Sequence, residues 1–313
     1  DLDFGLDLLL EVVADPGFDD AAVDAARPVI LEELAWSADT PDDVVHQNLA
    51  LGLFPDHPLG WEVLGTADTV SGLRADDIRA FHHRWYRRPN LVVAVVGDVD
   101  HDAICERVDV GLAALEGGAP PQRAAPDQPV DPEMRAHRGI EQSHIALGWR
   151  APDQHDDRRF ALAVANQLIG GGWSSRLFQE IRERRGMSYT VFSSVGSYAD
   201  SGTLSVYAAT SPERLDQLVE VVDAELADLV ERGPTAREVE VARGGFEGGT
   251  VIALEDPGSR MAQIAAGLLV RDRVVDIDEY LARVRAVTAD DVQAVLADVL
   301  GGPRVRSVVV PGA

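Results

Sequence analysis

The sequence predicts an α+β protein built from two related α/β halves, of which the first is incomplete. Segments with apolar residues at helical spacing alternate with short, continuous apolar runs of strand length. A stretch rich in proline and glycine, residues 117–132, is the one clear linker. The order of helix, proline and strand near the end of the first part recurs near the end of the second.

The first part of the chain is mostly helical. Apolar positions at helical spacing predict helices over residues 2–14, 19–38 and 74–87. Residues 91–96 (LVVAVV) are a continuous apolar run that ends at a glycine, which predicts a buried strand.

The second part of the chain combines strands and helices. Residues 145–149 predict a strand and residues 156–169 a helix. Residues 189–209 predict a hairpin that turns around Asp-Ser-Gly at 200–202. Helices are expected from 212 to 300, and residues 305–310 predict a last strand.

An internal repeat supports two related halves. An ungapped offset of 214 places residues 75–78 (ADDI) on residues 289–292 (ADDV), and Pro89 on Pro303. Chance similarity of two amphipathic helices is the alternative, but the matching prolines and strands favour a duplication. We therefore expect a first half at 1–117, a linker at 118–136 and a second half at 137–313. On this alignment the first half lacks about eighty residues that match the start of the second.

The composition excludes several classes of protein. The chain carries 28 basic residues, all arginine, against 53 acidic ones, which gives a net charge of −25. This charge opposes binding to nucleic acids and anionic membranes, and no apolar run is long enough to span a bilayer. A single cysteine, Cys105, excludes an internal disulfide and a cysteine-based zinc site.

Several motifs resemble one family over essentially the whole chain. Residues 29–34 read VILEEL, residues 57–60 HPLG and residues 93–99 VAVVGDV. Residues 168–178 read LIGGGWSSRLF and residues 181–189 IRERRGMSY, the most specific block. The chain resembles peptidase family M16, the pitrilysin, insulinase and mitochondrial processing peptidase group, and especially its small bacterial members. The resemblance implies the M16 metallopeptidase (LuxS/MPP-like) fold, in which two such halves or subunits enclose an extended peptide.

The resemblance implies a zinc ion that this chain cannot bind alone. In the family, an HxxEH motif supplies two histidine ligands and a glutamate base, and a later glutamate completes the site. Neither HxxEH nor HExxH occurs among the 313 residues, so we expect that motif in the missing front segment of the intact parent. Glu33 matches the later zinc ligand. The alternative is that Glu32 and Glu33 form a solvated patch on a helix.

The resemblance also implies catalytic roles for Arg182 and Tyr189. Together they would reach across the cleft and donate hydrogen bonds to the substrate carbonyl and the developing oxyanion. Taken alone, Arg182 could instead form a surface ion pair with Glu180 or Glu183, and Tyr189 could pack in a strand. The three glycines at 170–172 are expected to form a turn between two helices, because no lysine follows to make a phosphate loop.

These implications give two functional expectations. The first is a zinc-dependent endopeptidase of peptides or unfolded proteins, working as a homodimer or with an M16-like partner subunit in the bacterial cytoplasm. The alternative is a non-catalytic M16-like subunit or scaffold that holds peptides or a partner without its own zinc. His144, at the start of a predicted strand, is expected to pack against the sheet.

Overall fold

The structure is a computed structural model that describes residues 2–119 and 122–312. Its internal contacts divide the chain into two compact units, each assembled from three separate segments. Unit 1 contains residues 1–36, 64–124 and 253–275, and unit 2 contains residues 37–63, 125–252 and 276–313. These units are defined by contacts between residues and not by sequence duplication, so the two related halves predicted from the sequence stay a prediction.

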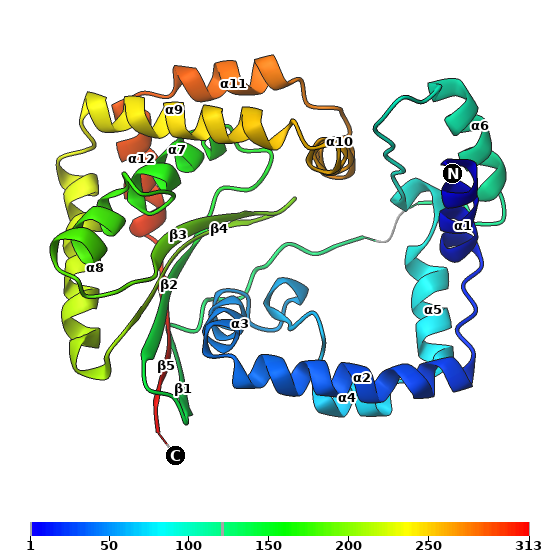
Figure 1. Cartoon of the computed structure of the whole chain (residues 1–313), viewed down its shortest axis with the longest axis horizontal. Coiled ribbons are helices and arrows are strands. Elements are labelled where there is room, and N and C mark those ends of the chain that lie inside the picture. The colour runs from blue at the N-terminus through cyan, green and yellow to red at the C-terminus, as the bar shows by residue number, and fades with distance from the viewer. Residues whose placement is uncertain (1, 120–121, 313) are drawn as a thin grey trace. The chain divides into compact units, whose positions relative to one another are not determined.

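Unit 2 is built on one five-stranded sheet with the order β1-β5-β2-β4-β3 (Figure 1). Strands β1 and β5 are parallel, and the other neighbours are antiparallel. The strands are β1 (Glu133–Arg138), β2 (Ser143–Ala151), β3 (Val191–Ser197), β4 (Gly202–Thr210) and β5 (Arg304–Pro311). The predicted last strand and the hairpin at 189–209 are confirmed as β5 and as β3 with β4. Strand β1 was not predicted, because its sequence EMRAHR is too polar to resemble a buried strand.

Helices cover both faces of this sheet (Figure 1). On one face the main core lies between the sheet and helices α7 (Arg159–Ile169), α8 (Leu215–Glu231) and α12 (Ala289–Leu300). The other face is covered by α3 (Pro41–Leu53), which packs on β5, β2 and β1. Alternate residues of β2 serve the two layers: Ile145 and Leu147 belong to the main core, and Ala146 belongs to the core under α3.

The remaining elements of unit 2 are mostly short. The π-helical segment η3 (Phe178–Arg184) precedes β3, and the 3-10 turn η4 (Pro212–Arg214) follows β4. The others are the 3-10 turn η1 (Pro58–Gly60), α9 (Ala236–Ala253) and α11 (Ile277–Ala286). The helices predicted between 212 and 300 are therefore confirmed.

Unit 1 has a much smaller core. The residues Leu6, Leu10, Leu112 and Leu115 form its buried cluster. Its helical elements are α1 (Leu2–Ala14), α2 (Asp20–Asp39), α4 (Ala67–Gly72), α5 (Ala75–Trp85), η2 (Arg88–Asn90), α6 (His101–Gly111) and α10 (Pro257–Arg271). The helices predicted at 2–14, 19–38 and 74–87 are confirmed to within two residues at each end.

The strand predicted at residues 91–96 is wrong. These residues have no regular secondary structure and pair with no strand in the described part of the chain. Their side chains are half-buried, and Leu91 and Val93 pack against the small core of unit 1. The apolar pattern correctly indicates packing, but a strand also needs partners for its backbone groups. Within the described residues, no helix is long and apolar enough to cross a bilayer.

Candidate functional site

Arg182 and Tyr189 lie in direct contact. Arg182 belongs to η3, and Tyr189 lies in the irregular segment that joins η3 to β3. The guanidinium carbon of Arg182 is 4.1 Å from the centre of the Tyr189 ring and 4.9 Å from that of Phe178. This is the geometry of a cation–π contact. The structure therefore brings together the two residues that the sequence singled out.

The chain reverses direction between these two residues. Gly186 has a φ of +57°, the left-handed conformation that glycine adopts without strain. Its N–H donates to the carbonyl of Arg182 over 3.2 Å, and the Met187 N–H donates to Ile181 O over 2.9 Å. This turn carries Tyr189 back beside η3.

Of the alternatives for these side chains, the ion pair of Arg182 with Glu183 is present, whereas one with Glu180 is not recorded within the described residues and Tyr189 does not pack in a strand. Glu180 bonds Arg184 and Arg185, both at 2.7 Å, and these two bonds hold the pKa of its carboxyl below the usual value. The nearest carboxylate contact of Arg182 is to Glu183, at 3.8 Å. Tyr189 is not part of a strand and is 78% exposed. Both members of the pair therefore keep polar groups that a ligand can reach.

A pocket of about 610 Å³ opens beside the pair. Its walls come from η3, the segment after it, the end of β4 and η4. The lining includes Arg182, Glu183, Tyr189, Thr210, Glu213 and Arg214. Hydrogen bonds from its own backbone N–H and from Ser211 lower the pKa of Glu213, so this carboxyl is ionised at neutral pH.

The glycine motif forms a turn between α7 and η3, as predicted. A Cβ at Gly170 would lie 2.4 Å from the backbone nitrogen of Ser193 in β3, which excludes any larger residue without movement. The Ser193 N–H donates to Gly170 O over 3.3 Å. Glycine is therefore needed here because the turn touches the backbone of a strand.

The arginine of the same motif is structural. The Arg176 side chain is 15% exposed and forms ion pairs with Glu238 at 2.6 Å and Asp228 at 2.7 Å. These carboxylates belong to α9 and α8, so Arg176 ties the motif to two helices. Desolvation raises the pKa of the Glu238 carboxyl, but its bonds from Arg176 and Thr235 outweigh this and lower it.

Glu33 lies on α2 in unit 1, and its side chain is exposed, as is that of Glu32. Within the described residues, no group of three histidine, cysteine, aspartate or glutamate side chains could hold a metal ion. These residues alone therefore do not fit a zinc ion, which needs several ligands at once. The ligand role of Glu33 stays a prediction.

An aromatic cluster that was not predicted as a unit lies on the sheet face that α3 covers. Tyr207 bonds His144 over 2.9 Å, and its ring contacts His46 and Phe192 at 5.0 Å each. Burial lowers the pKa of His144, and burial together with Asp42 raises the pKa of Tyr207 to about 12. The expected packing of His144 against the sheet is confirmed. These residues are far apart in the sequence, so no local sequence pattern predicts that they lie together.

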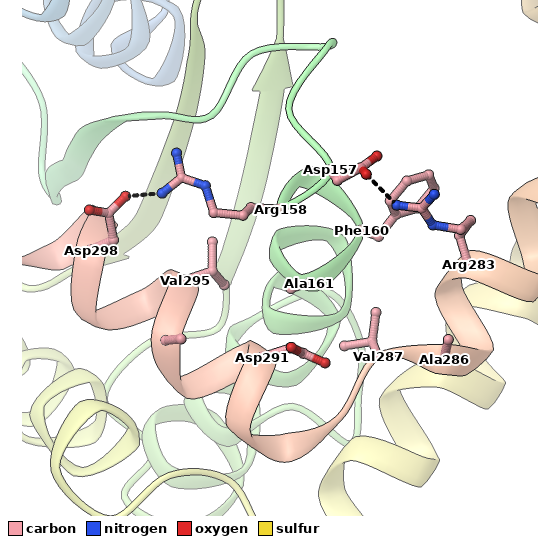
Figure 2. Close-up of a pocket in the computed structure, with 11 residues that line it drawn as sticks. Asp157, Arg158, Phe160, Ala161, Arg283, Ala286, Val287, Asp291, Val295 and Asp298 are labelled. Carbon is pink, nitrogen blue, oxygen red and sulfur yellow. Dashed lines mark hydrogen bonds and ion pairs between the residues drawn. The ribbon is translucent and has the colours of Figure 1, made fainter.

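A second pocket, of about 470 Å³, lies among α7, α11 and α12 (Figure 2). Two ion pairs of 2.7 Å cross its rim, Arg158 with Asp298 and Arg283 with Asp157. Its floor is apolar and includes Ala161 and Val295. Asp291 also lines this pocket and accepts a hydrogen bond from the Thr288 hydroxyl over 2.7 Å, so these charged groups are engaged within the fold.

Comparison with known proteins identifies the family. The family model described as "Peptidase M16 inactive domain" matches residues 72–246, which include Arg182 and Tyr189. The chain is 40% identical to a Streptomyces coelicolor protein named "Uncharacterized zinc protease SCO5738", over 99% of this chain and 70% of that protein. It is 37% identical to "Uncharacterized zinc protease Rv2782c" of Mycobacterium tuberculosis, over 96% of this chain and 70% of that one.

Solved structures agree on the fold. A peptidase M16 inactive domain from Pseudomonas fluorescens superimposes with a TM-score of 0.89 at 23% identity, over 99% of this chain and 75% of that one. A protease from Helicobacter pylori gives 0.88 at 21% identity, over 99% and 77%. At these identities the structures establish the fold alone, which confirms the predicted α+β class of the M16 type. From its sequence and its fold, the chain belongs to the peptidase M16 family.

Proposed function

We propose that this chain binds peptide substrates within a zinc endopeptidase of the M16 family, and that Arg182 and Tyr189 bind the carbonyl of the bond to be cleaved. The contact between these two side chains at an open pocket carries the proposal. A guanidinium and a phenol are both hydrogen-bond donors, and such donors stabilise negative charge as it develops on a carbonyl oxygen.

The stacked geometry suits this role. With the Tyr189 ring at 4.1 Å, the guanidinium of Arg182 is oriented by an aromatic face. An aromatic face occupies none of its N–H donors, whereas a bidentate carboxylate occupies two. The N–H donors of Arg182 therefore remain available to a ligand, and their direction is already fixed. Donors that are pre-organised in this way stabilise a transition state most effectively.

The neighbouring strand β3 offers a means of holding an extended peptide. It is an edge strand of the sheet and begins two residues after Tyr189. A peptide that adds to such an edge is held by main-chain hydrogen bonds, with little demand on its sequence. The glycine turn already bonds the Ser193 N–H. A peptide would therefore pair on either side of that residue.

The metal part of this proposal rests on the family. Zinc held at such a site would activate a water for hydrolysis. Glu33 would be one of its ligands, and these 313 residues contain no HxxEH motif. In the active assembly, a homodimer or a pair with an M16-like partner subunit, the histidine ligands and the general base would have to come from other residues. What this chain supplies directly is substrate binding and carbonyl recognition.

Peptide binding tests the proposal directly. The affinity of the chain for an unstructured peptide of about fifteen residues would be measured by isothermal titration calorimetry. We expect Arg182→Ala and Tyr189→Ala each to weaken binding about tenfold, the range for losing one charge-assisted contact. Arg158→Ala, which removes the surface ion pairs with Asp156 and Asp298 in the same unit, is the matched control and should have no effect. Equal affinity of all four proteins would refute the proposal.

The second candidate is a non-catalytic subunit that holds peptides without contributing to the metal site. The match to a family model described as an inactive domain favours it. Glu33→Gln distinguishes the two in an assembly whose partner carries HxxEH. Loss of zinc would support Glu33 as a ligand, and unchanged zinc and hydrolysis would make the chain a peptide-holding subunit.

A further inference from the structure

The segment that carries Tyr189 is irregular, and yet its backbone is held at three points. The Arg214 guanidinium donates to Gly186 O over 3.0 Å, and the Thr210 hydroxyl donates to Met187 O over 2.7 Å. The Ser188 hydroxyl lies 2.7 Å from both Thr190 O and Ala209 O and can donate to either. Gly186 O and Met187 O are thus bonded by side chains, and Thr190 O also accepts from the Ala209 N–H of β4 over 3.3 Å.

Two of the three anchoring side chains, Thr210 and Ser188, are buried, whereas Tyr189 is exposed. Thr210 is 2% exposed and Ser188 6%, against 78% for Tyr189. Hydrogen bonds shielded from water resist exchange with solvent, so they fix the segment more firmly than exposed bonds would. Thr210 is also the last residue of β4, so its hydroxyl bonds the segment to a fixed part of the sheet.

We propose that Thr210, together with Ser188 and Arg214, is a positioning residue that holds residues 186–190 so that the Tyr189 ring stays against Arg182. This inference rests on the proposed function of that pair. Thr210 borders the pocket, but it is 2% exposed and its hydroxyl donates to Met187 O, so an effect of that hydroxyl on binding passes through the segment. A shift of about 1 Å in Tyr189 would misalign its donor relative to that of Arg182, and a misplacement of this size can cost about a hundredfold.

The test is a double-mutant cycle on peptide binding with the full chain. We expect Thr210→Val, which removes the hydroxyl at nearly constant shape, to weaken binding about tenfold, within the range of coupled neighbours. In a Tyr189→Ala background the same substitution should have no further effect. Thr210→Ser, which restores the donor, should recover binding.

A matched control lies on the same strand. The Thr203 hydroxyl also bonds a backbone group, the N–H of Gly196 at 3.2 Å, but at the opposite end of β4. Thr203→Val should leave the peptide affinity unchanged. If Thr210→Val does not fold, Ser188→Ala removes the other buried hydroxyl of the same set and enters the cycle in its place.

The outcomes separate the two proposals. If Arg182→Ala and Tyr189→Ala weaken binding but Thr210→Val does not, the positioning role is refuted and the proposed function stands. If Thr210→Val weakens binding equally with and without Tyr189, Thr210 acts on the fold in general and the positioning role is again refuted. If neither Arg182→Ala nor Tyr189→Ala affects binding, both proposals fail.

Discussion

Replacing Gly170 with alanine should destabilise the protein through one identifiable contact. The added methyl group would stand 2.4 Å from Ser193 N and 2.9 Å from the carbonyl carbon of Phe192. Ordinary contacts of this kind need more than 3 Å, so the turn or β3 must move by several tenths of an ångström. Overpacking of this size costs about 1–3 kcal/mol. The displacement would also lengthen the bond from Ser193 N–H to Gly170 O, already 3.3 Å.

The same motif contains the control for this prediction. A Cβ at Gly172 would meet nothing nearer than 3.8 Å, so Gly172→Ala should change the free energy of unfolding by less than about 0.5 kcal/mol. Urea denaturation followed by circular dichroism measures both variants. If Gly170→Ala proves as stable as Gly172→Ala, close approach to β3 is not the reason for the glycine, and the steric account of the motif is wrong.

Four further predictions concern charge, the candidate site and metal. Arg176→Met should cost about 1–2 kcal/mol in urea denaturation, because the partly buried Glu238 carboxylate loses its close cation while Asp228 keeps its ion pair with Arg232, and a wild-type midpoint would contradict this. Tyr189→Phe keeps the ring against Arg182, so stability should be unchanged, whereas turnover in the zinc-loaded assembly should fall roughly ten- to a thousandfold; unaltered kcat would count against a donor role. Burial holds the pKa of His144 below 6.5, so on acidification below that value the unfolded chain binds a proton that the folded chain refuses. Stability should therefore fall from pH 7 towards the lowered pKa, and a pH slope that survives in His144→Gln would assign it to another group. After dialysis the chain alone should carry well under one zinc ion by metal analysis, and stoichiometric zinc held through Glu33 would overturn this.

Sequence patterns located the elements whose apolar residues are continuous or periodic. The runs in β2 and β5 identify strands because both faces of those strands are covered by helices. Strand β1 escapes because it is an edge strand with mostly exposed side chains, and such strands carry charges in place of an apolar pattern. For residues 91–96 the prediction failed in the opposite way. Their apolar composition is typical of a strand, but a strand also needs a neighbouring strand to pair with, and composition does not show whether one is present.

The candidate site was predictable in part for a similar reason. Arg182 and Tyr189 are close in sequence, so one local turn at Gly186 is enough to bring them into contact. Thr210 and Arg214 reach the same segment from more than twenty residues away, through the β3–β4 hairpin. Their contribution depends on register and on the end of β4, which no local pattern contains.

Two arginines of the motif block, Arg176 and Arg182, differ in how their charges are satisfied. Arg176 is mostly buried and bonds two carboxylates closely, which satisfies its charge inside the fold. Arg182 belongs to a chain of net charge −25, and yet its guanidinium carbon lies over the faces of Tyr189 and Phe178, 4.1 Å and 4.9 Å from the two ring centres. Its one recorded carboxylate contact, to Glu183, is 3.8 Å long. Aromatic faces therefore orient the Arg182 guanidinium while its carboxylate contact stays long, and donors held in this way are the ones that the proposed recognition of a peptide carbonyl requires.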